Sequence, residues 1–387
     1  MKKYLIGFLS IFMLYGGQIF AQKTEEMTAP AAPQGMRGIP INIPDISVMG
    51  DIVGKVTSNK SDEDRNTVHI REIELALQGF IYPQMRADAF LAMHRHGDEV
   101  EAEICEAYVS FLKVLGDLSI QVGKPHINFG KINKVHQHHR HYTDQPQVIT
   151  NFFGDHGLVG EGGNLSYLLP LPIFAQIDVG AWRIEGHHHH DEEEVETAEV
   201  WSDKGTITVA IYKEHEHTEF GLRDGVYTAR LWTSFPISAD SELEVGISGA
   251  KGKGAHYEEH MDNAEVYGVD ITYKLCPSAH SRVIFQSEWL QLTREVPPGT
   301  LKRNGFYSLL NYKANKYWDV GLRYDYAESA WPPLDEKDDK ASTSFIITKN
   351  LTETTGLRAQ YKANGHSKDE AYLQIFFGIG PHSHPLE

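Results

Sequence analysis

The sequence contains 21 histidines, and many of them stand in clusters beside carboxylates. Neutral imidazole is the commonest protein ligand for Zn²⁺, Cu²⁺ and Ni²⁺, and carboxylates can complete a coordination shell. The clustered residues that could bind such an ion are His136, His138, His139, His141, His187, His188, His189, His190, Asp191, Glu192, His215 and His217. They predict weak binding of Zn²⁺ or another divalent transition metal at several places, with no cofactor that the protein requires.

A plainer interpretation stays open, because a histidine-rich tract can be a solvated segment that holds no ligand. Consecutive histidines surround one tetrahedral ion poorly, and the sequence has neither an H-E-x-x-H motif nor a paired-cysteine motif. An enzyme is not indicated, because no G-x-S-x-G motif occurs and the many Ser, His and Asp residues show no diagnostic spacing. The pair Asp155 and His156 is interpreted as a polar turn.

A second set of charged residues recurs at every other position in segments that are otherwise apolar. In residues 267–275, for example, Tyr267, Val269 and Ile271 alternate with Asp270 and Lys274. A strand sends successive side chains to opposite faces, so such a segment is predicted to be a strand with one apolar and one polar face. The charged residues predicted to line the polar face are Glu72, Glu74, Arg86, Asp88, Asp178, Arg230, Glu242, Glu244, Asp270, Lys274, Arg323, Asp325, Arg358 and Lys362. Most of these charges are expected to pair with one another and keep the wall wet.

The connectors between these strands decide between a soluble barrel and a membrane barrel. Short turns alternate along the chain with longer polar stretches at 57–66, 131–160, 184–223, 250–263, 295–303 and 328–340. This asymmetry is typical of outer-membrane barrels, which have tight periplasmic turns and long outer loops. We therefore predict an all-β, transmembrane antiparallel β-barrel whose apolar face meets lipid.

About sixteen strands are predicted, an even number as bacterial barrels require. They start near Ser47, Val68, Met85, Ala102, Leu118, Asn164, Ile173, Gly225, Leu243, Glu265, Arg282, Asn304, Tyr317, Ser342, Thr355 and Ala371. Residues 206–212 also alternate and are assigned to a long outer loop at 184–223 that is rich in histidine and acidic residues. A barrel of this size leaves an aqueous channel, whereas about eight strands would fill the interior with side chains.

The amino terminus has the features of a secretory signal. Lys2 and Lys3 precede an apolar run over 4–14, and small residues end at Ala21, so residues 1–21 are predicted to be a cleaved signal peptide. A retained anchor is the alternative, but this run is shorter than the roughly 20 residues that a spanning helix needs. Residues 22–44 form a Pro- and Ala-rich lead-in, residues 45–380 the barrel, and residues 381–387 a histidine-containing tail. The location expected is the bacterial outer membrane.

Charge and cysteine content narrow the function classes further. The formal net charge of -17 disfavours nucleic acid as a partner, since its phosphates would be repelled. Cys105 and Cys276 are the only cysteines. They fall near opposite ends of predicted strands, too far apart for the roughly 7 Å between Cα atoms that a disulfide allows, so both thiols are predicted to be free.

These features resemble the outer-membrane porin superfamily. Besides the strand number, the likeness rests on the aromatic-rich closing segment 371–379 and on the long connector 131–160 after the fifth strand, which is expected to end near Gly130. The resemblance implies that this connector folds into the pore and narrows it, and that the protein is a homotrimer. Residues 380–387 depart from the pattern, because many porins stop on the aromatic closing strand. The block 123–158 also resembles porin-like proteins linked to zinc limitation.

Three functions are therefore expected of such a barrel. The first is a porin-like channel for passive diffusion of small hydrophilic solutes or ions, and the second is a channel that passes a divalent metal such as zinc. The third is a metal-binding receptor or surface-binding barrel that has no conducting pore.

Overall fold

The computed structural model describes residues 44–60, 62, 64–96, 99–184, 196–202, 205–211, 220–254, 262–296, 299–330, 341–365 and 368–381. The chain divides into Met1–Ile43 and Pro44–Glu387, and all described residues belong to the second unit. The predicted signal peptide, nearly all of the lead-in and most of the carboxyl-terminal tail lie outside the described residues. Among the described residues, no helix combines the length and the apolar character needed to cross a bilayer.

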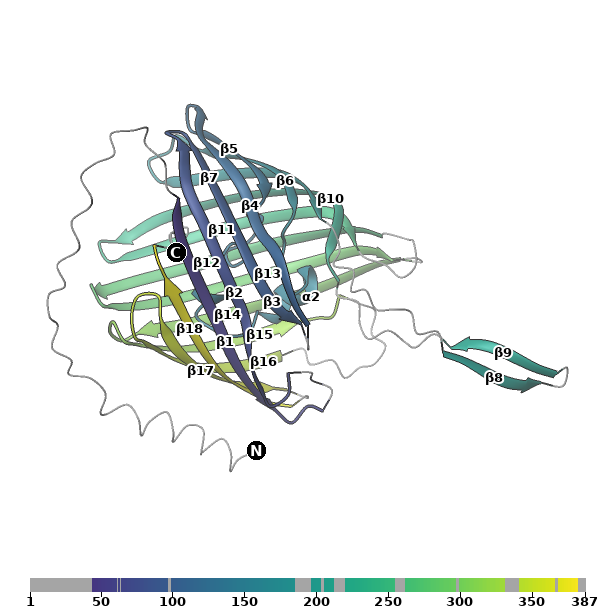
Figure 1. The fold of residues 1–387 in the computed structure, drawn as a ribbon. Helices are drawn as coiled ribbons and strands as arrows, with labels where there is room; N and C mark the ends of the chain where they lie inside the picture. The colour runs from purple at the N-terminus through teal and green to yellow at the C-terminus, as the bar shows by residue number, and fades with distance from the viewer. Residues whose placement is uncertain are drawn as a thin grey trace, which may run out of the picture. The chain divides into compact units, whose positions relative to one another are not determined.

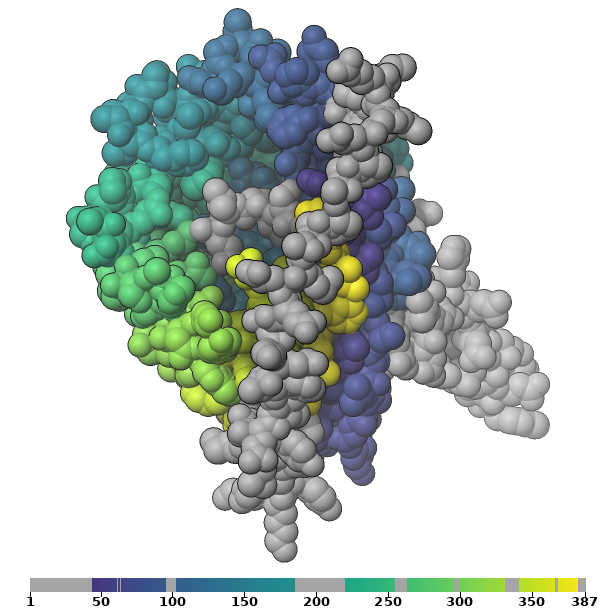
Figure 2. Space-filling model, turned by 60° about the vertical axis from the view of Figure 1, so that its left-hand side comes forward, coloured from purple at the N-terminus to yellow at the C-terminus, as the bar shows by residue number. Residues whose placement is uncertain are grey.

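Sixteen antiparallel strands close into a barrel (Figure 1). In chain order they are β1 (Asp45–Thr57), β2 (Thr67–Tyr82), β3 (Met85–His96), β4 (Glu99–Leu115), β5 (Leu118–Lys124), β6 (Glu161–Leu168), β7 (Phe174–Ile184), β10 (Leu222–Ser238), β11 (Ser241–Gly254), β12 (Asp262–Ser278), β13 (Ser281–Val296), β14 (Gly299–Lys313), β15 (Trp318–Ala327), β16 (Ala341–Asn350), β17 (Gly356–Asn364) and β18 (Glu370–Ile379). The first and last strands pair, purple beside yellow in Figures 1 and 2, with Asp51 opposite Phe376. Closure leaves no unpaired strand edge, as a barrel in lipid requires.

The predicted fold class is confirmed, and so is the strand number. No predicted strand start lies more than five residues from the observed one. Of residues 206–212, assigned to an outer loop, all but the last lie in β9 (Gly205–Ile211), which pairs with β8 (Glu196–Ser202) as a separate two-stranded sheet and not with the barrel, and Tyr212 lies outside the described residues.

The two faces of the wall differ as the alternation predicts. On β15, Leu322 is 50% exposed whereas the adjacent Arg323 is fully buried. The exposed positions of other strands are also mostly apolar, as at Ile104 of β4, Val179 of β7 and Phe345 of β16. Buried positions carry charged or amide side chains over much of the wall. An apolar exterior around a polar interior is the arrangement of a membrane-spanning barrel.

Connector lengths follow the predicted asymmetry in part, because three connectors at the end with long loops are short, at 97–98, 297–298 and 365–369. One end of the barrel, the short-turn end, has connectors of two to five residues, from the β2–β3 turn to the β16–β17 turn. The opposite, long-loop end carries the connectors 58–66, 125–160, 185–221 and 328–340. The long connector predicted at 295–303 is wrong, because β13 runs to Val296 and β14 resumes at Gly299. These strand ends carry charged side chains such as Arg294 and Arg303, so the alternation that marks a strand in lipid is missing there.

One long connector, residues 125–160, lies inside the barrel, and we call it the inward loop. It starts earlier than predicted, because β5 ends at Lys124 and not near Gly130. Pro125 explains the early end, since proline has no N–H to donate to the sheet. The loop contains a short 3₁₀ helix, η1 (Gln137–His139), and one helix, α2 (Gln147–Phe153). The helix ends at Gly154, whose φ of 84° is readily adopted by glycine alone.

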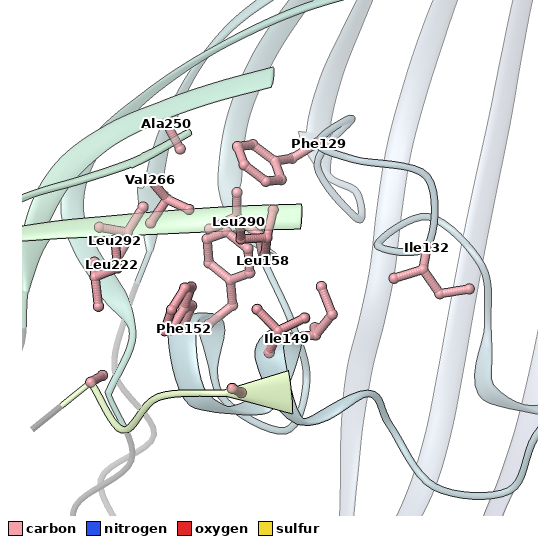
Figure 3. Close-up of a cluster of buried hydrophobic side chains, with 14 of the residues drawn as sticks. Phe129, Ile132, Ile149, Phe152, Leu158, Leu222, Ala250, Val266, Leu290 and Leu292 are labelled. Carbon is pink, nitrogen blue, oxygen red and sulfur yellow. The ribbon is translucent and has the colours of Figure 1, made fainter. Parts of the chain in front are cut away.

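The inward loop is held by an apolar cluster within the barrel (Figure 3). Phe152 and Ile149 of α2, each at most 2% exposed, pack in one cluster with Leu290 and Leu292 of β13. Further members come from the inner faces of strands β7 and β10 to β16. The lumen is therefore not lined by polar residues throughout. On the side formed by β7 and β10 to β16, apolar side chains point inward and α2 covers them.

Candidate functional site in the lumen

The polar part of the inward loop is tied to the barrel wall on several sides. Asp144 forms ion pairs with Arg323 of β15 (2.8 Å) and Lys362 of β17 (3.0 Å). On another side, Lys131 lies 2.5 Å from Glu244 of β11. Burial alone would raise the pKa of Asp144, but the charges of Arg323 and Lys362 outweigh it and hold this pKa well below its ordinary value. The loop thus spans the lumen from wall to wall.

Backbone contacts add to these ion pairs. Arg358 donates to the carbonyl of Tyr142 (3.1 Å), and Arg71 donates to the carbonyl of Thr143 (2.6 Å). Arg71 also pairs with Asp51 of β1. Charged groups that hold backbone carbonyls fix the loop's position, since hydrogen bonds to charged groups contribute about 1.5–3 kcal/mol each.

His136 ties the inward loop to two further strands, β2 and β4. Its Nδ1 lies 2.9 Å from Glu74 of β2, and its Nε2 lies 2.7 Å from Glu106 of β4. Burial opposes the charged form, but the two carboxylates outweigh it and raise the pKa of His136 well above 6.5. Both ring nitrogens then donate, and the imidazolium bridges two strands. The ring centroid of His126 lies 5.5 Å from that of His136. The pKa of His126 shifts in the opposite direction, because burial lowers it to about 4.

Three cavities border His136. The first, about 240 Å³, lies toward the long-loop end and is lined by residues including His94, Glu103 and Arg183. The second, about 270 Å³, lies toward the short-turn end beside β2 to β5. The third, about 210 Å³, lies across the lumen beside β7, β10 and β12 to β14. His136 therefore separates a space near one end of the barrel from spaces nearer the other.

The structure brings together part of the predicted metal set. His136 and His138 offer ligand atoms within 4.8 Å of one another and of Glu74, which the sequence assigns to the wall. His139 and His141 border the third cavity, and the ring of His139 lies 4.4 Å from that of His138. The remaining predicted ligands, His187, His188, His189, His190, Asp191, Glu192, His215 and His217, lie outside the described residues.

Each charged residue predicted to point inward has a buried or half-buried side chain. Most of them meet another wall residue. Arg230 pairs with Asp270 (2.8 Å), Lys274 with Glu244 (2.9 Å), and Arg323 with Asp325 (2.7 Å). Other members of the set form a further ion pair, Arg86 with Asp88, and side-chain hydrogen bonds, which join Glu242 to Ser234, Asp178 to Asn164, Ser166 and Gln176, and Arg358 to Gln374. That they line a conducting pore stays a prediction.

The sequence analysis missed a group of residues on β3 and β4. His94, Glu103 and Cys105 line the first cavity, and Glu106 contacts His136. The reason is a β-bulge, where the pairing shifts between Phe90–Glu106 and Leu91–Ile104 and leaves Cys105 as the extra residue. A bulge changes which face a side chain points to, so strict alternation fails here. His94 could have been found, because it has the same parity as Arg86 and Asp88.

Both cysteines are free, as predicted. Cys105 is half-buried on β4, whereas Cys276 is exposed near the short-turn end of β12.

No family model matches the sequence. A protein of Aquifex aeolicus (strain VF5) that is described as uncharacterized is 25% identical over 353 residues, which cover 84% of this chain and 71% of the Aquifex protein. The metal and zinc-limitation expectations receive no support from these comparisons.

Solved structures resemble this chain over most of its length. OmpT of Vibrio cholerae, an outer membrane protein, matches in a loop L8 deletion mutant with a TM-score of 0.52 and 7% identity, over 87% of this chain and 99% of that one. OmpF of Salmonella typhi, solved with daunomycin, matches with a TM-score of 0.52 and 11% identity, over 87% and 98%. At these identities the likeness concerns the fold. The chain thus has the fold of bacterial outer-membrane β-barrel proteins, and a closed barrel with an apolar exterior belongs in that membrane.

Proposed function

We propose that the protein is an outer-membrane channel for small hydrophilic solutes or ions, in which the inward loop restricts passage at His136. The observation that carries this proposal is that three cavities, spread toward both ends of the barrel, all border this one side chain. On the side of the lumen formed by β10 to β13, the apolar cluster occupies the half nearer the long-loop end. Passage would then follow the polar wall of β2 to β5.

The lining of this route favours ions or polar solutes. Glu74 and Glu106 carry negative charge on the wall, while Lys134 and Arg140 of the inward loop border the same cavities. Charges of both signs across a narrow passage create a transverse field, and rings or clusters of charge select among ions. The three cavities, of about 210 to 270 Å³ each, favour small solutes.

Planar-bilayer recording of the purified protein tests the channel. We expect discrete conductance steps, and a reversal potential that departs from zero in a salt gradient. A barrel that inserts, as shown by resistance to protease in vesicles, but gives no steps would refute the channel and favour a surface-binding barrel.

A second candidate function is passage of a divalent metal. It rests on the grouping of Glu74, His136 and His138, since histidine nitrogens and a carboxylate suit Zn²⁺, and the metal would have to replace a ring proton of His136. Micromolar zinc added during recording should change the current of the wild type. Replacing His136, His138, His139 and His141 by Ala should abolish that response, and an unchanged zinc response in this variant would remove the candidate.

We further propose that the protein assembles as a homotrimer. One of the structures that the barrel resembles is a trimer form of OmpT of Vibrio cholerae. Mass measurement of the protein in detergent would support this with three chains per particle and refute it with one.

A further inference from the structure

A cluster of three side chains near the long-loop end of the barrel has the composition of a transition-metal site. His94 lies two residues before the end of β3, and Glu103 and Cys105 lie on the adjacent strand β4. The three ligand atoms fall within 4.8 Å of one another. None of these residues belongs to the histidine-rich tracts, and the ion pairs of Asp144 are made by other residues, Arg323 and Lys362.

The distances within the cluster match a coordination shell. His94 Nε2 lies 3.2 Å from Glu103 Oε1 and 3.2 Å from Cys105 Sγ, and the sulfur lies 3.7 Å from the same oxygen. Zinc bonds of about 2.0 Å to nitrogen and oxygen and about 2.3 Å to sulfur separate the corners of a tetrahedron by about 3.3 Å (N to O) and about 3.5 Å (to S). The three atoms therefore already occupy three corners of such a tetrahedron to within a few tenths of an ångström.

The backbone explains how the three atoms meet. Cys105 is the extra residue of the β-bulge between Phe90 and Leu91 of the partner strand. The bulge lets Cys105 and Glu106 both face the lumen, which a regular strand forbids. Glu103 precedes the bulge on the same face, opposite Ala92.

The surroundings complete a metal site of the open kind. Glu72 Oε2 lies 3.9 Å from Nδ1 of His94, so a carboxylate faces the ring nitrogen that the metal would leave unused. Such a carboxylate fixes the tautomer of a ligating histidine. The fourth corner opens to the cavity of about 240 Å³, which His156 of the inward loop also lines, its ring 5.7 Å from that of His94.

We infer that His94, Glu103 and Cys105 form a binding site for a thiophilic divalent cation of the Zn²⁺ class, with an exchangeable fourth ligand. Nitrogen, sulfur and one carboxylate oxygen select Zn²⁺ over the oxygen-seeking Mg²⁺ and Ca²⁺. Binding replaces the thiol proton of Cys105 by the metal, and that proton passes to solvent, so affinity falls as the pH falls. The site goes beyond the proposed channel and does not depend on conduction.

Cobalt absorbance of the full-length protein in detergent tests the site, because Co²⁺ bound to a thiolate gives a charge-transfer band in the near ultraviolet. Co²⁺ held only by histidine nitrogens does not produce this band. We expect the band in the wild type and in Cys276→Ser, which serves as the matched control. It should vanish in Cys105→Ser and His94→Ala, and Glu72→Gln should weaken binding roughly tenfold, the lower end of effects from outer-shell partners.

A wild type without the band, or a band that survives in Cys105→Ser, would overturn the site. Zinc protection provides a second measurement on the unaltered chain, should a variant fail to fold. Zn²⁺ should slow alkylation of Cys105 and leave Cys276 unaffected, whereas equal rates with and without zinc at Cys105 would also overturn it. Neither readout uses current, so a failed site and a failed channel give different results.

Discussion

Replacing Asp144 by Ala should release the tip of the inward loop from the wall. The carboxylate is approached by Arg323 and Lys362 at 2.8 and 3.0 Å, and Gln360 also donates to it. Removing one partner of a buried ion pair costs about 3–5 kcal/mol, because the other charge is left uncompensated. We expect the lower end, about 3 kcal/mol, since Arg323 keeps Asp325 at 2.7 Å. That energy shifts the balance between held and released loop by roughly 100-fold.

Single-channel recording and limited proteolysis measure this release. Asp144→Ala should show larger and noisier conductance steps than the wild type, and new cleavage within residues 131–160. Glu265→Gln is the matched control, because its ion pair with Lys251 is largely exposed and such pairs contribute little. Conductance and cleavage equal to the wild type in Asp144→Ala would refute the view that this anchor positions the loop.

Acid should imitate that substitution in the wild type. The pKa of Asp144 is lower in the folded protein than its usual 3.9, so the stabilisation is complete above about pH 4 and is lost as the pH falls toward the folded value. Proteolytic release of the loop should therefore begin only below about pH 4 in the wild type; release starting near pH 6 would contradict the assignment.

Three further perturbations test other parts of the structure. Glu74 and Glu106 raise the pKa of His136, so His136 should remain protonated at pH 6.5, its ordinary pKa. Its contribution to stability is therefore full below that pH and is lost only as the pH rises through the higher pKa of the folded protein. A His136 NMR signal, assigned with His136→Gln, that titrates near 6.5 would be inconsistent with the pairing. Phe152→Ala should reduce the free energy that holds α2 against the wall by about 3–5 kcal/mol and so raise the rate of cleavage in the inward loop. An unchanged cleavage rate would count against the apolar cluster. Leu322→Arg should destabilise the barrel in lipid vesicles by about 2–4 kcal/mol, and no loss would show that this face does not meet hydrocarbon.

Much of the wall could be predicted from the sequence because lipid imposes a rule on it. Where a strand crosses hydrocarbon, as around Leu322 and Arg323, one face must be apolar, and the period of two is visible. The rule lapses beyond the bilayer, which is why the ends of β13 and β14 near Val296 and Gly299 were interpreted as a loop.

The interior was harder to predict, because it depends on contacts between distant residues. The histidines of 136–141 marked the right loop, but their partners Glu74 and Glu106 come from strands far away in the sequence. The bulge at Cys105 shifts the phase of the alternation between Glu103 and Glu106, so extending the regular pattern along β4 does not show which residues face His94. Inward apolar residues such as Leu290 were also missed, since an expected wet lumen gives them no role.

Chemical modification inside the lumen tests most directly whether solutes pass the inward loop. Lys134 borders the cavity beside β2 to β5 and the cavity across the lumen. Lys134→Cys, made in a chain that also carries Cys105→Ser and Cys276→Ser, would be exposed to a charged methanethiosulfonate reagent during recording. The matched control is Leu322→Cys on the exterior. We predict that the reagent reduces the current through Lys134→Cys and leaves that through Leu322→Cys unchanged, and an undiminished current in a chemically modified Lys134→Cys protein would contradict the proposed route.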